Sequence, residues 1–119
     1  MAYEDEHFID STRLVWNYSY FTDEDIKQFR AGHFYSGYEK FGNHYTRVLN
    51  TNGFYFAVWA PNATAVSVIG EFNGWKKQIH PLYVRLDKSG IWEGFIPRLE
   101  KGVLYKYHIT GFEGIENEK

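Results

Sequence analysis

From Tyr45 onward, apolar and polar residues alternate with a period of two, and this alternation constrains the fold more than any other feature of the sequence. The alternating runs are rich in Val, Ile, Tyr, Phe and Trp, and Gly, Asn, Asp and Pro separate them. Successive side chains of a strand point to opposite faces of a sheet, so the pattern predicts strands. The expected strands are residues 45–49, 54–59, 65–70, 83–86, 91–96 and 104–110.

Three short turn sequences separate predicted strands. The Asn-Thr-Asn-Gly sequence of residues 50–53 predicts a four-residue hairpin loop, because Asn and Gly tolerate positive φ angles. Residues 87–90 (Asp-Lys-Ser-Gly) predict a second hairpin turn, and residues 100–102 (Glu-Lys-Gly) predict a third. Six or seven short strands with a turn about every 8 to 12 residues are typical of an immunoglobulin-like antiparallel β-sandwich, so the expected fold class is all-β.

A short helix is expected ahead of the strands. Thr22 is a suitable N-cap, and the acidic residues 23–25 fill the first turn, where the helix dipole favours negative charge. Apolar residues follow at helical spacing, and Gly32 can end the helix in a left-handed conformation. The prediction is one short helix over residues 23–31.

The pattern divides the chain into two parts. Residues 1–34 are predicted to form an N-terminal arm with the short helix, and the acidic first ten residues are expected to pack loosely. Residues 35–119 are predicted to form the sandwich. Residues 111–119 are polar and are expected to end without a closing strand, after a turn at residues 111–114. The chain is therefore expected to be a truncated piece of a longer protein.

The composition limits the partners of this chain. The 4 Trp, 10 Tyr and 10 Phe make up 20% of the 119 residues, more than one core of this size needs, so some rings are expected at the surface. A formal net charge of −2 without a basic run argues against a nucleic-acid partner. There are no cysteines, so we expect no disulfide and a cytoplasmic location. No apolar stretch approaches about 18 residues, so no membrane partner is expected.

No catalytic, cofactor-binding or metal site is expected in this chain. The five histidines are scattered, with no recognised metal-binding spacing. The carboxylates Glu71, Asp87 and Glu93 lie isolated in turns or alternate with core positions, so none forms a pair of nucleophile and general acid. None of the 11 glycines belongs to a phosphate-binding loop between a strand and a helix.

The sequence around Trp75 is the leading candidate for a binding site. A predicted strand ends in Gly-Glu-Phe, and a turn at Asn73 and Gly74 then presents Trp75 next to Lys76 and Lys77. A flat indole at a turn matches the apolar face of a pyranose ring, and nearby Lys and Asn side chains can hydrogen-bond its hydroxyls. In the alternative interpretation, Trp75 folds back and plugs one end of the sandwich.

Two further residues each have two interpretations. Alternation along the last predicted strand points Tyr105 and Tyr107 to one face and Lys106 to the other. On the outer face, Lys106 either hydrogen-bonds a sugar or protects the strand edge against aggregation. Trp92 is expected in the core, with a place in an interface as the alternative.

Five blocks of the sequence, in order, resemble the N-terminal region of bacterial glycogen branching enzymes. The resemblance covers roughly residues 35–119, and the Phe-Asn-Gly-Trp turn on its own also occurs in other glucan-binding modules. The blocks are Tyr-Glu-Lys-Phe-Gly at 38–42, Phe-Ala-Val-Trp-Ala-Pro-Asn-Ala at 56–63, Val-Ser-Val through Phe-Asn-Gly-Trp at 66–75, Ser-Gly-Ile-Trp-Glu with Phe-Ile-Pro at 89–97, and Leu-Tyr-Lys-Tyr at 104–107.

This resemblance implies a glucan-binding module that precedes an α-amylase-type barrel. Such an enzyme cuts an α-1,4 glucan and transfers the piece to a 6-hydroxyl, with an Asp nucleophile and a Glu acid/base. Those carboxylates belong to the barrel, so this chain alone is expected not to catalyse. The implied partners are α-glucan and the enzyme's own catalytic domain. The implied carbohydrate contacts are Trp75 and Lys106, with Asn73, Lys77 and Phe112 as further candidates.

Two other functions remain open on the sequence. The surplus aromatic rings could dock onto the catalytic barrel, which would make the chain an interdomain scaffold without a sugar site of its own. A glycogen-sensing module of a kinase complex is the third possibility. The Tyr-Glu-Lys-Phe-Gly block disfavours it, and so does the missing second tryptophan after the lysine strand, where Phe112 stands instead.

Overall fold

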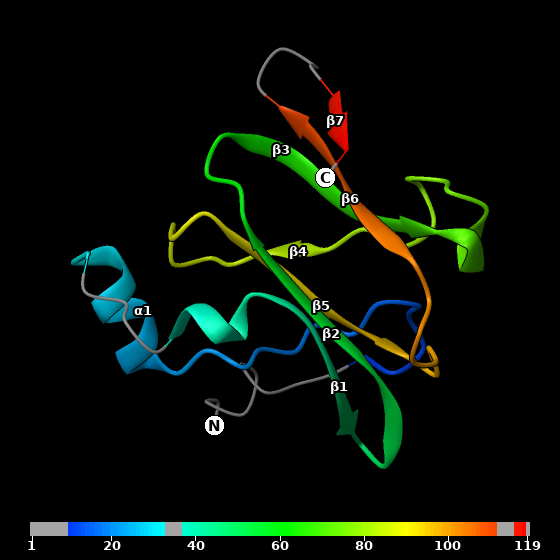
Figure 1. Ribbon diagram of the computed structural model, residues 1–119. Helices are drawn as coiled ribbons and strands as arrows, with labels where there is room; N and C mark the ends of the chain where they lie inside the picture. Colours follow the sequence, from blue (N-terminus) through cyan, green and yellow to red (C-terminus); the bar gives the residue numbers. More distant parts are fainter. Residues whose placement is uncertain (1–9, 33–36, 112–115, 119) are drawn as a thin grey trace.

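Two antiparallel sheets form an immunoglobulin-like β-sandwich in the computed structural model, which describes residues 10–32, 37–111 and 116–118 (Figure 1). One sheet has the order β1-β2-β5-β4 and the other β3-β6-β7, and all paired strands run antiparallel. The all-β prediction is confirmed. The strands are β1 (Gly42–Val48), β2 (Thr51–Trp59), β3 (Ala63–Gly70), β4 (Tyr83–Val84), β5 (Ile91–Pro97), β6 (Tyr105–Gly111) and β7 (Glu116–Glu118).

One apolar cluster fills the space between the two sheets. Phe56 of β2 meets Val66 and Val68 of β3, and none of the three is more than 1% exposed. Tyr107 of β6 and Trp92 of β5 belong to the same cluster, so Trp92 is a core residue as predicted. Burying such side chains fully stabilises the fold by about 1.5–3 kcal/mol each.

A second apolar cluster covers the other face of the four-stranded sheet. Alternation along β2 sends Tyr55 away from the sandwich core, and Phe95 of β5 does the same. Trp16 and Phe21 of the N-terminal segment pack against them, and Trp16 exchanges two backbone hydrogen bonds with Phe95, of 2.7 and 2.9 Å. In Figure 1 this segment, drawn in blue, runs along the four-stranded sheet away from β3 and β6. β2 is therefore buried on both faces.

The predicted helix is present as α1 (Asp23–Arg30). Thr22 is its N-cap, and Thr22 and Asp25 form a reciprocal capping box. Ile26 is buried in the second cluster, and Gly32 follows the helix with a φ of 82°, as expected for a left-handed end. Lys40, at the end of the 3-10 helix η2 (Gly37–Lys40), donates hydrogen bonds to the Asp25 carboxylate and to the Tyr20 carbonyl.

The prediction for the first hairpin loop is wrong. Val48 pairs with Thr51, so the turn consists of Leu49 and Asn50, whose φ angles are 50° and 61°. Two consecutive positive φ angles give a two-residue turn whose twist matches the right-handed twist of the flanking strands. Residues 51–53 belong to β2 instead. Gly53 allows β2 and β5 to approach closely, since a Cβ at this position would lie 2.3 Å from the Ile96 carbonyl oxygen.

Two predictions about the C-terminal half are also wrong. Residues 100–102 do not close a hairpin, because β5 and β6 lie in different sheets and the connection crosses between them. The chain does have a closing strand, since β7 pairs with β6 in the register His108 to Glu118. Both errors concern pairing with distant strands, which local turn chemistry does not encode. The hairpin turn predicted at residues 87–90 is confirmed between β4 and β5.

Candidate functional site

The candidate site is a turn that follows β3. The 3-10 helix η3 (Glu71–Asn73) begins directly after Gly70, the last residue of the strand. The Gly74 N–H donates to the Glu71 carbonyl at 3.2 Å, and the Trp75 N–H donates to the Gly70 carbonyl at 2.9 Å. These hydrogen bonds fold the chain back onto the end of β3 and fix the position of the Trp75 backbone.

The Asn73 side chain holds this turn together. Its Oδ1 accepts a hydrogen bond from the Gly70 N–H at 3.0 Å, and its Nδ2 donates to the Val68 carbonyl at 2.9 Å. The same Nδ2 lies 2.9 Å from Nδ1 of His80. An amide nitrogen has two hydrogens, so both are used inside the protein. The prediction that Asn73 bonds a sugar stays a prediction, and its observed contacts are those of a turn-positioning residue.

Trp75 combines an exposed ring with an unusual backbone. Its side chain is 42% exposed, and it belongs to neither apolar cluster of the described residues. Its φ of 61° is left-handed, a conformation that costs roughly 1–2 kcal/mol for a residue with a Cβ. Strain of this kind persists where the surroundings over-determine it, often at functional sites. The geometry favours the interpretation in which Trp75 presents an exposed ring to a ligand over the one in which it folds back and plugs the end of the sandwich.

The lysine on the last predicted strand lies near the same turn. Lys106 of β6 is exposed and pairs with Ile69 of β3, the residue before Gly70, whose carbonyl accepts from the Trp75 N–H. The fold thus brings Lys106 and the Trp75 turn to the same end of the β3–β6 pair. Lys77 is exposed two residues beyond Trp75. Phe112 lies outside the described residues.

Sequence reasoning missed two residues that the structure makes conspicuous. His80 is 8% exposed and anchors Asn73, yet the six residues between them carry no pattern that would have indicated the contact. Trp59 is 55% exposed at the end of β2 and lines a groove. A tryptophan that ends an alternating strand two residues before Pro61 was a usable signal, because alternation along the strand predicts on which face of the sheet its side chain lies.

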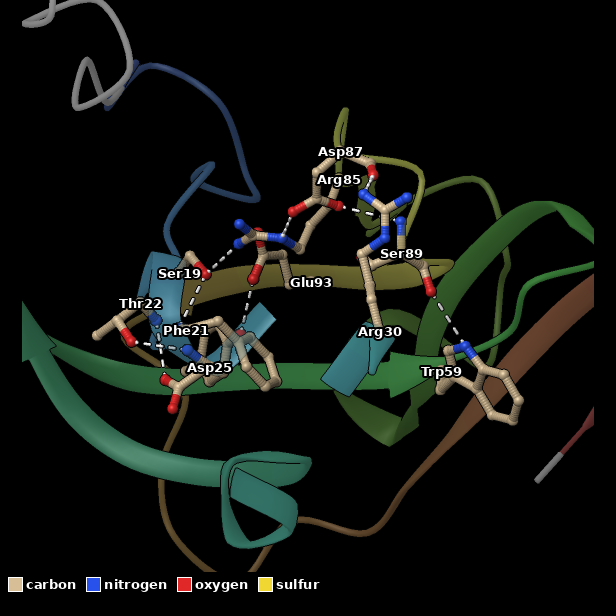
Figure 2. Close-up of polar contacts among 11 residues, drawn as sticks. Ser19, Phe21, Thr22, Asp25, Arg30, Trp59, Arg85, Asp87, Ser89 and Glu93 are labelled. Atoms are coloured by element: carbon tan, nitrogen blue, oxygen red, sulfur yellow. Dashed lines mark hydrogen bonds and ion pairs between the residues drawn. The ribbon is translucent and has the colours of Figure 1, made fainter. Parts of the chain in front are cut away.

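Glu93, the most buried carboxylate among the described residues, belongs to a structural network (Figure 2). Glu93 is 4% exposed and accepts hydrogen bonds from the Tyr55 hydroxyl at 2.8 Å and from Arg85 Nη1 at 3.1 Å. Burial raises the pKa of Glu93, while these hydrogen bonds and the Arg85 charge oppose the rise. Arg85 also donates to Ser19 and Asp87. One Glu93 oxygen thus ties β5 to Tyr55 of β2, and the other ties it to Arg85 of the β4–β5 turn, which in turn bonds Ser19 of the N-terminal segment.

Across residues 10–32, 37–111 and 116–118, no three His, Asp or Glu side chains are arranged to hold a metal ion. No helix in the same ranges is long and apolar enough to cross a membrane.

The fold and the exposed turn define a class of protein, an immunoglobulin-like β-sandwich module that displays a tryptophan at one end of its three-stranded sheet. Comparison with protein families makes the assignment specific. Residues 40–119 match the family described as carbohydrate-binding module 48 (isoamylase N-terminal domain), and the chain belongs to this family.

Curated relatives are much longer than this chain. It is 47% identical over 98 residues to the 1,4-alpha-glucan branching enzyme GlgB of Trichormus variabilis, a match that covers 82% of the chain and 13% of the relative. The identity is 50% over 98 residues to the enzyme of the same name from Thermosynechococcus vestitus, covering 82% and 12%. It is 46% over 93 residues to that from Desulfitobacterium hafniense, covering 78% and 15%.

Proposed function

We propose that this chain is a glucan-binding module of a 1,4-alpha-glucan branching enzyme and that it binds α-glucan through the Trp75 turn. Its family and the names of its relatives support the proposal. The observation that carries it is the exposed indole of Trp75, at the same end of the β3–β6 pair as Lys106.

Each residue of the site has a chemical role in this proposal. The Trp75 ring stacks on the apolar face of a glucose unit, because its turn holds the ring outward before any sugar arrives. Lys106 and Lys77 donate hydrogen bonds to sugar hydroxyls, and Asn73 keeps the turn in shape. Phe112 remains a further candidate contact. One ring with a few polar contacts gives weak binding, with a dissociation constant on the order of millimolar to tens of micromolar.

The parent enzyme supplies the chemistry. In the proposed reaction an α-1,4 glucan is cut and the piece is transferred to a 6-hydroxyl, which forms an α-1,6 branch. The nucleophile and the acid/base are carboxylates of a separate catalytic barrel, which is also the module's protein partner. The module raises the local concentration of glucan at that barrel. A cytoplasmic location fits the cysteine-free sequence.

Titration of the 119-residue chain with maltoheptaose tests the proposal, followed by tryptophan fluorescence and amide NMR shifts. Saturable shifts at Trp75 and Lys106 are expected. Trp75→Ala removes one stacked ring, worth about 2 kcal/mol, and should weaken binding at this turn about 30-fold. Leu86→Ala is the control, since Leu86 is 94% exposed in the β4–β5 turn of the other sheet. Equal binding by Trp75→Ala and the unmodified chain would place the sugar elsewhere.

Exposed apolar side chains support a second candidate function. Leu104 is 73% exposed and Leu14 is 60% exposed, as expected if part of this surface packs against another domain. A scaffold of this kind needs no sugar site. It predicts concentration-dependent self-association of the isolated chain and no response to maltoheptaose, measured by analytical ultracentrifugation and by the same titration.

A further inference from the structure

A groove of about 840 Å³ lies between the end of α1, the end of β2 and the β4–β5 turn. Its volume is within the range of about 300–1,000 Å³ that is common for small-ligand sites. None of the described residues that line it is acidic. The lining includes Phe29, Arg30, Phe41, Trp59, Pro61 and Lys88.

Trp59 is held rigidly in this groove. Its Nε1 donates a hydrogen bond to the Ser89 carbonyl at 3.1 Å, which Figure 2 shows. Phe29 of α1 meets the ring edge-on, with centroids 5.8 Å apart and an interplanar angle of 80°. The ring nevertheless remains 55% exposed, more than Trp75. An indole whose N–H is already satisfied offers its apolar face to a ligand and loses little freedom on binding.

The backbone beside the ring is built for close contact. Gly90 has a φ of 83°, and a Cβ there would lie 3.1 Å from Trp59 Nε1 and 2.9 Å from Pro61. A larger residue would press on Pro61 and would displace the tryptophan by a few tenths of an ångström. The β4–β5 turn therefore sets the ring orientation, which is a property of a prepared platform rather than of a loose surface side chain.

Cationic hydrogen-bond donors stand at the rim of the groove. Arg30 Nη1 donates to the Asp87 carbonyl at 2.9 Å, which uses one of the five N–H donors of a guanidinium. Lys88 is exposed beside it. A rigid indole face next to such donors suits a ligand that pairs an apolar ring face with many oxygen acceptors, and a pyranose has this chemistry.

We propose that the Trp59 groove is a second α-glucan subsite, separate from the Trp75 turn. Trp59 ends β2 just before β3, and Trp75 follows the other end of β3. An eight-residue strand is about 25 Å long, so the two rings contact separate stretches of glucan. Two weak sites on one module raise the apparent affinity for a long polymer well above that of either site. The choice of α-glucan as ligand rests on the proposed function.

The indole N–H signals of the four tryptophans separate the two sites in one NMR titration. Trp16 and Trp92 are buried and donate their indole N–H groups to the carbonyls of Arg13 and Ala60. They are internal references, and Trp→Phe variants assign the peaks. With maltoheptaose, the Trp59 and Trp75 signals should both shift and saturate, each with its own dissociation constant. Cellohexaose, which has β-1,4 linkages, should bind at Trp59 with a dissociation constant at least tenfold higher than that of maltoheptaose. This corresponds to a difference in binding free energy on the order of 1.4 kcal/mol.

Variants keep the test independent of the Trp75 site. Trp75→Ala should leave the Trp59 titration unchanged. Arg30→Gln should weaken binding at Trp59 several-fold without affecting Trp75, whereas Lys27→Gln, an exposed position on the same helix, should change neither. A Trp59 signal that stays still while Trp75 shifts would overturn the second subsite and leave the proposed function standing. A shift at Trp59 alone would support the subsite and refute the Trp75 site. No shift at either, with self-association of the chain, would refute both.

Discussion

At the scale of single residues, Trp75 is held in a conformation that glycine adopts more easily. The residue before it, Gly74, has a φ of 69°, and Trp75 continues with 61°. The hydrogen bond from the Trp75 N–H to Gly70 fixes this backbone whatever side chain it carries. The strain therefore arises from the Cβ of Trp75, and exposing the ring at this position lowers the stability of the fold.

Substitutions at Trp75 should separate stability from binding. Trp75→Gly and Trp75→Ala both remove the ring, but only Gly relieves the left-handed strain, so the Gly variant should unfold with a free energy about 1 kcal/mol higher than the Ala variant. Urea denaturation measures the difference. Both variants should lose maltoheptaose binding at the Trp75 turn, followed through the Lys106 amide shift, to the same degree. An Ala variant as stable as the Gly variant would show that Trp75 is not strained.

His80, which bonds the turn through Asn73, makes the free energy of unfolding depend on pH. Its Nδ1 accepts a hydrogen bond from Asn73, so the neutral ring carries its proton on Nε2. Burial lowers the pKa of His80 below the ordinary histidine value of 6.5. As the pH falls through 6.5, the unfolded chain binds a proton that the folded chain resists, and the free energy of unfolding decreases. This contribution is fully present above pH 6.5 and is lost on acidification.

The variant His80→Gln tests this dependence. A glutamine oxygen can accept from Asn73 but does not titrate, so the variant should lose less stability than the unmodified chain between pH 7 and pH 5. The measurement is urea denaturation at each pH. All other groups are common to both proteins, so their contributions cancel in the comparison. Parallel pH profiles would mean that His80 is protonated equally in both states.

At the scale of elements, α1 depends on its capping box. Thr22 accepts from the Asp25 N–H at 3.1 Å, and Asp25 accepts from the Thr22 N–H at 2.9 Å. Burial raises the pKa of Asp25, but hydrogen bonds from Lys40 and Thr22 outweigh this effect and leave the pKa below the ordinary aspartate value of 3.8. The pair therefore stabilises the fold above pH 3.8, and this stability is lost as the pH falls further.

Removing the cap should destabilise the whole domain because α1 packs on the sheet through Ile26. Thr22→Ala should lower the free energy of unfolding by about 1 kcal/mol at pH 7. Thr22→Ser keeps the acceptor and should lie within a few tenths of a kcal/mol of the unmodified chain. Chemical denaturation followed by circular dichroism measures both. Equal losses in the two variants would implicate the threonine methyl group instead of the cap.

At the scale of the whole molecule, the N-terminal segment is part of the folded unit. Its described residues Trp16, Phe21 and Ile26 cover the outer face of the four-stranded sheet. The division of the chain at residue 34 remains a prediction, and the match to the family begins at residue 40. The apolar face under the segment needs this cover or an equivalent one.

Deleting residues 1–31 should therefore expose Tyr55 and Phe95, which are fully buried in the intact chain. The shortened chain is expected to melt at a lower temperature and to self-associate, as measured by calorimetry and ultracentrifugation. Deletion of residues 1–9 is the control, since it removes none of the described contacts. A shortened chain with unchanged melting temperature would support an independent module that begins near residue 35.

Local patterns in the sequence determined the strands, the helix and the candidate turn, because alternation, capping and turn propensity act over a few neighbouring residues. Phe56 and Tyr55 show the limit of this reasoning. Both read as strand residues, but only tertiary packing decided that one faces β3 and β6 and the other faces Trp16. The same long-range contacts put β5 and β6 in different sheets and His80 beneath Asn73. Such pairings join residues distant along the chain, and their energy depends on the complete packed arrangement rather than on any local run.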